Sequence, residues 1–161
     1  MEINLSLFDN KKKLLPQKNH ANVDDLMAYN ALGNTNLRVS KIGFGCIPIM
    51  RLNMTAAKSL LKYGFDMGIN FYDTANGYGD SEEKLGETFC GMRNKIIIGT
   101  KSLERDGKNI MEHINLSLKR LKTDYIDLYQ LHQVSQMEDY NKIFAQGGAL
   151  ETLHRAKKKG K

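Results

Sequence analysis

The sequence predicts an α/β domain in which parallel strands alternate with helices. Apolar stretches of strand length alternate four times with segments whose apolar residues recur at helical spacing. The run "KIIIGTK" at 95–101 is apolar between two charged ends, a pattern typical of a strand buried on both faces of a parallel sheet. The order βαβαβαβα implies parallel strands joined by right-handed crossovers.

The length and charge of the chain are those of one ordinary globular domain. Its 161 residues suffice for one sizeable core. The net charge of +6 comes from 24 basic and 18 acidic residues, and much of the excess lies in lysine runs at 11–13 and 157–161. Such runs are usually solvated, and no aromatic residues are interleaved with them, so we expect no nucleic-acid partner.

Cysteine usage and hydropathy indicate a cytoplasmic protein. Cys46 and Cys90 are far apart and show no metal-ligand spacing, so we expect neither a disulfide framework nor a metal site. No apolar run approaches the ~18 residues that a membrane span needs, and the N-terminus lacks the apolar core of a signal peptide. We therefore expect a soluble protein without a membrane partner.

The first part of the chain differs from the rest. Residues 1–25 are polar and show no sustained period, so they are predicted to form a flexible extension, with the folded domain at 26–161. The stretch "GNT" predicts a short hairpin in which Gly33 and Asn34 take positive φ angles. The hairpin leads into a strand, "KIGFGC", at 41–46.

The next elements follow in alternation. Apolar residues at helical spacing predict a helix over 54–67, which Gly68 ends as a C-terminal cap. The strand "INFYD" follows at 69–73. A second helix begins at "DSEEKLGETF", where Asp80 and Glu83 have the spacing of a capping box.

The second half continues the pattern after the strand at 95–101. A helix is predicted near 110–121, a fourth strand in "DYIDLYQLH" and a final helix at 148–160. Asp127 is expected to have a structural role. The remaining histidines show no ligand spacing and are expected to face solvent: His20, His113 and His154.

Polar side chains stand where three predicted strands end. Asp73, Lys101 and His132 are 28 and 31 residues apart, close to one βα repeat of about 30 residues. The carboxyl ends of parallel strands share one rim, where ligands bind in such sheets, so these residues should lie side by side. Tyr78 follows Asp73 in the glycine-rich loop "TANGYGD" and can lean over the same rim.

These four residues together suit proton donation to a carbonyl oxygen. A tyrosine is a weak acid at neutral pH, and a nearby ammonium stabilises the phenolate that proton donation leaves. Asp73 can hold Lys101 in place, and His132 can hydrogen-bond the substrate oxygen. Taken singly, each residue could be a packing, turn or boundary residue. A reduced cofactor would have to supply the hydride, and "GFG" at 43–45 is not a dinucleotide fingerprint, since Pro48 replaces its third glycine.

The sequence resembles the aldo-keto reductases, a (β/α)8-barrel family that uses NADPH or NADH to reduce aldehydes and ketones. The motifs "GINFYDTANGYGDSEEKLGE", "IIIGTK" and "LKRLKTDYIDLYQLH" occur in the family's order and spacing. The resemblance implies that Asp73, Tyr78, Lys101 and His132 are the catalytic residues, with Tyr78 as the proton donor to a small carbonyl substrate.

The same resemblance extends to the cofactor and to a branch of the family. Gly45, Cys46 and Ile47 fall where the family contacts nicotinamide and substrate, together with Asp73. The phrase "GCIPIMRL" is similar to members that often carry a C-terminal iron-sulfur segment. The expected cofactor is NADPH or NADH.

The chain departs from the family in its number of strands. Only four βα units of the (β/α)8 TIM barrel are predicted after the hairpin, so the chain reads as an N-terminal half of the barrel, apparently truncated. The two outer strands would then present open edges, through which self-association is possible. Two alternatives to an active reductase are open: a non-catalytic binding or regulatory barrel module, and an inactive half-barrel.

Overall fold

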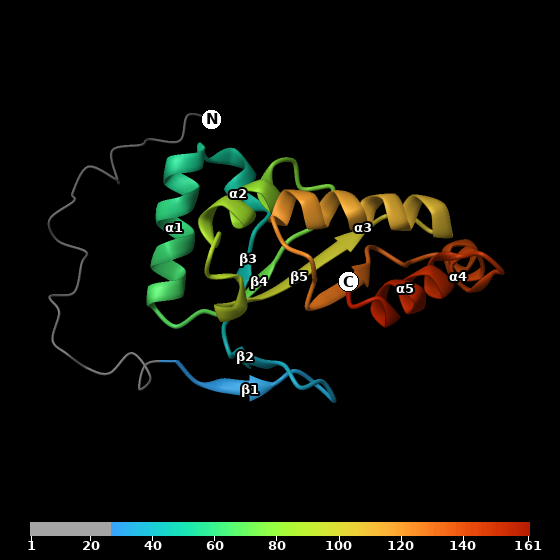
Figure 1. Ribbon diagram of the computed structural model, residues 1–161, viewed down its shortest axis with the longest axis horizontal. Helices are drawn as coiled ribbons and strands as arrows, with labels where there is room; N and C mark the ends of the chain where they lie inside the picture. The colour runs from blue at the N-terminus through green and yellow to red at the C-terminus, as the bar shows by residue number, and fades with distance from the viewer. Residues whose placement is uncertain (1–26) are drawn as a thin grey trace, which may run out of the picture.

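A computed structural model describes residues 27–161. The predicted flexible extension at 1–25 lies outside the described residues, as do His20 and the lysine run at 11–13. In the described part, the βα alternation predicted from the sequence is confirmed, and Figure 1 shows its course.

Four parallel strands form the central sheet, in chain order from one edge to the other. Each strand pairs in parallel with the next, so all four carboxyl ends meet at one rim. Gly45 pairs with Asp73, and Asp73 in turn pairs with Gly99. The strands are β3 (Phe44–Gly45), β4 (Phe71–Asp73), β5 (Ile97–Ser102) and β6 (Leu128–Leu131).

Helices connect the strands and pack side by side in chain order, α1 against α2, α2 against α3 and α3 against α5. The main ones are α1 (Met54–Asp66), α2 (Ser81–Thr88), α3 (Gly107–Leu121) and α5 (Ala149–Lys158). Three short helices were not predicted: η3 (Pro48–Arg51), η4 (Arg93–Lys95) and α4 (Met137–Phe144). No helix within residues 27–161 is long and apolar enough to cross a bilayer.

The predicted hairpin precedes the sheet. Strand β1 (Tyr29–Ala31) pairs antiparallel with β2 (Arg38–Ser40), and Figure 1 shows this pair below the parallel strands. Gly33 takes a positive φ of 55°, as predicted, whereas Asn34 does not, because one left-handed residue suffices for this turn. The Asn70 side chain attaches the hairpin: its Oδ1 accepts from Ser40 N at 2.7 Å, and its Nδ2 donates to Arg38 O at 2.9 Å.

The ends of α1 and α2 show one correct and one wrong prediction. Gly68, one residue after the C-cap of α1, has φ +90°, a left-handed conformation that favours glycine. The capping box at the start of α2 is wrong. The Asp80 backbone is not extended, and its carboxylate accepts from Lys84 Nζ at 2.6 Å rather than from a backbone amide of the helix.

The core lies between the sheet and the helices that cover it. Tyr72 points from β4 into this core and is completely buried; its ring lies 5.6 Å from Phe44 and 4.9 Å from Phe89, centre to centre. Its hydroxyl donates to Leu61 O at 3.2 Å, which satisfies the one polar group that the ring brings inside. The neighbouring side chains on β4, Phe71 and Asp73, point to the opposite face of the sheet, and of these two only Asp73 stands at the carboxyl end of the strand.

Candidate active site

The ends of three adjacent strands bring the predicted polar residues together. Asp73 is the last residue of β4, and Lys101 is the last but one of β5. His132 follows β6 directly, and its N–H donates to Ser102 O at 2.8 Å, which continues the ladder by one bond. Parallel pairing therefore holds the three backbones at one rim, while Tyr78 reaches it from the loop after β4.

Lys101 is at the centre of this group. Its ammonium donates to Asp73 Oδ2 at 2.6 Å and to Thr74 O at 2.7 Å. The same nitrogen lies 5.2 Å from the centre of the Tyr78 ring. The Lys101 side chain is only 12% exposed, whereas that of Asp73 is 40% exposed. The carboxylate thus compensates a largely buried positive charge, which would otherwise be costly.

Tyr78 and His132 face each other across the rim. The Tyr78 hydroxyl lies 3.5 Å from His132 Nε2, and the two rings meet edge to face with centres 5.7 Å apart. Burial, and then the charge of Lys101, lower the pKa of His132 below its ordinary value. At neutral pH the imidazole is therefore neutral and can share a hydrogen bond with an oxygen placed beside the phenol.

The loop that carries Tyr78 is fixed along its length. Asn76 N–H donates to Lys101 O at 2.9 Å, and Asn76 O accepts from Arg120 Nη1 at 3.1 Å. Gly79 takes φ +50°, so the turn after Tyr78 uses a conformation that most residues avoid. The phenol is thus presented by a rigid loop, which favours catalysis over a mobile surface role.

The last residue of β3 and the segment after it supply the open part of the rim. Gly45 is exposed, and a Cβ added to it would meet no atom within 4 Å among the described residues. The Ile47 side chain is half exposed. Cys46, grouped with them in the sequence analysis, is completely buried, its thiol lies 3.5 Å from Phe44 O, and burial raises the thiol pKa. The structure therefore brings Gly45 and Ile47 to the rim surface, but not the Cys46 side chain.

Two residues of α2 that the sequence analysis missed hold the β3 loop in place. Ser81 Oγ donates to Cys46 O at 3.0 Å, and Lys84 Nζ donates to Ile49 O at the same distance. The Lys84 side chain is only 2% exposed. Lys84 lies on the same face of α2 as other buried residues of this helix. A lysine is seldom buried without hydrogen-bond acceptors, so its position on this face could have indicated that its ammonium binds the backbone of a neighbouring segment.

The two other histidines in the described part of the chain, His113 and His154, differ in their exposure to solvent. His113 was predicted to face solvent, but it is half buried and its Nδ1 lies 2.7 Å from Ser102 Oγ. The prediction is wrong because α3 packs this face against β5, where a serine offers a partner. His154 is exposed, as predicted.

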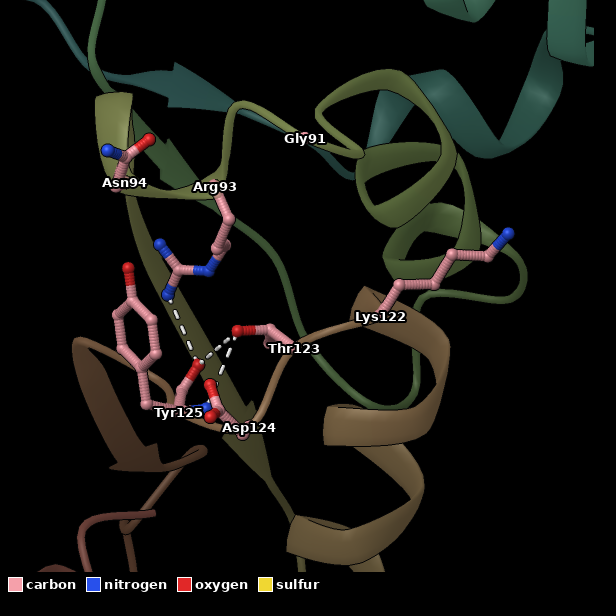
Figure 2. Close-up of a pocket in the computed structure, with 7 residues that line it drawn as sticks. All are labelled: Gly91, Arg93, Asn94, Lys122, Thr123, Asp124 and Tyr125. Atoms are coloured by element: carbon pink, nitrogen blue, oxygen red, sulfur yellow. Dashed lines mark hydrogen bonds between the residues drawn. The ribbon is translucent and has the colours of Figure 1, made fainter.

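The hollow in Figure 2, of about 570 Å³, lies at the opposite end of the strands from the rim. Its residues precede β5 and β6 rather than follow them. Arg93 dominates it, with its guanidinium 4.2 Å above the Tyr125 ring and 2.5 Å from Asp127 Oδ2. Asp127 Oδ2 also accepts from Ile98 N at 2.9 Å, which confirms its predicted structural role.

The family is decided by comparison with known proteins. Residues 41–161 match the model of the Aldo/keto reductase family. The chain belongs to this family. An uncharacterized oxidoreductase of Bacillus subtilis (strain 168), YqkF, is 39% identical over 120 residues, which are 66% of this chain and 39% of that protein.

Solved structures of aldo-keto reductases superpose on the chain. A putative aldo-keto reductase from Pseudomonas aeruginosa is 31% identical with a TM-score of 0.73, covering 82% of this chain and 56% of that one. An aldo-keto reductase from Klebsiella pneumoniae in complex with NADPH is 27% identical with a TM-score of 0.67, covering 77% and 43%.

These neighbours confirm the predicted fold class. The four parallel strands and their helices form part of the α/β barrel of the aldo-keto reductases. The chain spans about half the length of the proteins that it matches.

Proposed function

We propose that the protein is an oxidoreductase that uses NADPH or NADH to reduce the carbonyl group of a small aldehyde or ketone. The observation that carries the proposal is the position of the Lys101 ammonium, bonded to Asp73 and close to the Tyr78 ring. A cation held against a phenol suits a site where the phenol loses a proton.

The rim offers a place for a nicotinamide ring. Gly45 leaves open space where any other residue would place a Cβ, so a flat ring can approach the backbone there. Ile47, beside it, offers an exposed apolar side chain, and Asp73 an exposed carboxylate edge. The neighbour from Klebsiella pneumoniae was solved with NADPH, which supports the choice of cofactor. When bound, the reduced nicotinamide supplies the hydride that the carbonyl carbon accepts.

The side chains at the rim donate the proton and stabilise the groups that take part in its transfer. The Tyr78 hydroxyl donates its proton to the carbonyl oxygen as the carbon is reduced, and the product is the alcohol. The Lys101 ammonium stabilises the phenolate left behind. Neutral His132 shares a hydrogen bond with the substrate oxygen and so places it within reach of the phenol.

Two measurements test this function and separate it from the alternatives. NADPH is titrated against the protein by fluorescence, and then turnover of a nitrobenzaldehyde is followed by the loss of NADPH absorbance. The proposal predicts saturable binding and turnover. Binding without turnover would assign the protein to the regulatory modules, and the absence of binding would indicate an inactive half-barrel.

The iron-sulfur branch suggested by "GCIPIMRL" stays a prediction.

A further inference from the structure

A nearly buried arginine lies beside the rim without a part in the proposed chemistry. Arg105 stands on the loop between β5 and α3, and its side chain is 11% exposed. Its Nη2 donates to His132 O at 2.7 Å and reaches Gln133 O at 3.2 Å. One guanidinium therefore binds two consecutive carbonyl groups, the first of which belongs to the rim histidine.

The backbone at this point needs support. Gln133 takes φ +53°, a left-handed conformation that is unfavourable for a residue with a side chain. The turn begins immediately after His132 and changes the direction of the chain. Hydrogen bonds from a charged donor are about twice as strong as neutral ones, so the Arg105 contacts can hold this unfavourable turn.

Arg105 is itself fixed at both ends. Its Nε lies 3.2 Å from Asp139 Oδ1 on α4, so a carboxylate orients the guanidinium. Its backbone carbonyl accepts from Ala149 N, at the start of α5, at 2.9 Å. Helix α4 and the start of α5 thus both contact Arg105, and Arg105 in turn contacts the two carbonyl groups of His132 and Gln133. Because these contacts hold Arg105, its guanidinium has a definite position from which it can fix the carbonyl groups of His132 and Gln133.

We propose that Arg105, oriented by Asp139, is a positioning residue that fixes the turn after His132 and thereby holds the imidazole beside Tyr78. The proposal rests on the proposed function only in giving His132 a part in the reaction. The direction of a side chain follows from its backbone angles and rotamer, so a peptide fixed on the C-terminal side of His132 restricts the ring. Hydrogen-bond geometry between Tyr78 and His132 depends on that restriction.

A change in geometry can be distinguished from a change in charge by the titration of His132. The charged and titratable groups around it are Lys101, Asp73, Arg105 and Tyr78, and burial is the largest cause of its lowered pKa. Arg105→Lys keeps the positive charge but loses the planar fork that binds two carbonyl groups at once. If Arg105 acted by charge alone, the His132 pKa would be unchanged in this variant.

The experiment records the imidazole resonances of His132 by NMR as a function of pH, in the protein without cofactor. Asp139→Asn is the further variant, and Arg155→Lys, an exposed arginine on α5, is the matched control. In Arg105→Lys the loosened ring meets more water, so its pKa rises toward the ordinary value. Asp139→Asn gives a smaller rise and Arg155→Lys none. Thermal unfolding identifies any variant that fails to fold. If Arg105→Lys fails to fold, Asp139→Asn tests the proposal instead, because it removes the carboxylate that orients the Arg105 guanidinium.

Turnover gives a second readout. Misplacement of a reacting group costs about ten- to a hundredfold in rate, so kcat falls by this factor in Arg105→Lys while KM changes little. If Arg105→Lys folds and the pKa of His132 in it equals that in the wild-type protein, the proposal is overturned, whatever the turnover rate. A protein without turnover would contradict the proposed function, and the NMR titration would still decide the role of Arg105.

Discussion

At the scale of single residues, the central feature of the site is the positive charge of Lys101, which is largely buried and lies near the Tyr78 ring. Lys101 Nζ makes two hydrogen bonds, at 2.6 Å to a carboxylate and 2.7 Å to a carbonyl. Such charge-assisted bonds are short and strong, and they use two of the three donors of the ammonium. The centre of the Tyr78 ring lies 5.2 Å from the same nitrogen.

Lys101→Met tests this residue. The substitution keeps the length of the side chain but removes the cation that stabilises the phenolate, so we expect kcat for carbonyl reduction to fall about 10²–10³-fold. Lys58→Met is the matched control, because its exposed pair with Glu87 is long, at 3.9 Å, and lies away from the rim. Wild-type kcat in Lys101→Met, measured at saturating NADPH, would contradict the electrostatic role.

At the scale of elements, α2 joins the two loops of the site. Its first turn follows the Tyr78 loop, and Ser81 and Lys84 bind the loop after β3. Gly86 lets α2 approach α3 closely: a Cβ there would lie 2.3 Å from Arg120 O. Arg120 in turn binds Asn76 O in the Tyr78 loop, so this helix contact also supports the site.

Gly86→Ala measures the importance of the close approach. In an open helix, alanine would stabilise the protein by up to ~1 kcal/mol relative to glycine. Here the new methyl group meets backbone atoms that have no room to move, and overpacking of this kind costs about 1–3 kcal/mol. We therefore expect a lower free energy of unfolding in urea. Gly77→Ala is the control, since its Cβ would meet no atom within 4 Å, and an equal loss there would contradict the argument.

Sequence periodicity predicted the large elements because each has a strong local signal. Strand β5 is a nearly continuous apolar run, and α1 repeats apolar residues at helical spacing and ends before Gly68. The short helix α4 was missed, whereas α2, which has the same length of eight residues, was predicted in the segment that begins at Asp80. The capping box failed because Lys84, one turn later, attracts the Asp80 carboxylate, a competition that spacing alone does not reveal.

The site was predictable to the extent that strand ends determine position. Asp73, Lys101 and His132 lie at the rim because parallel pairing aligns their strands. The contacts of Arg105 were not predicted, because they are made to a left-handed turn at Gln133 that no sequence pattern marks. The burial of the Cys46 side chain was not predicted either, because it depends on how α2 packs against the end of β3.

At the scale of the whole molecule, the sheet within residues 27–161 has two outer strands. There, β3 pairs only with β4, and β6 pairs only with β5. Unpaired N–H and C=O groups on such edges favour pairing with another chain. We expect the 161-residue chain to self-associate, with a mass above that of one chain in size-exclusion chromatography with light scattering. A single-chain mass at all concentrations would contradict this.

The measurement that tests the central claim most directly compares Tyr78→Phe with the wild-type protein. The substitution removes only the hydroxyl, so NADPH binding, followed by fluorescence, should be unchanged. Reduction of a nitrobenzaldehyde should fall by about 10²–10⁴-fold, the usual contribution of a general acid. Unchanged binding with this loss of turnover is the result that we predict. Reduction by Tyr78→Phe at the wild-type rate would show that Tyr78 is not the proton donor.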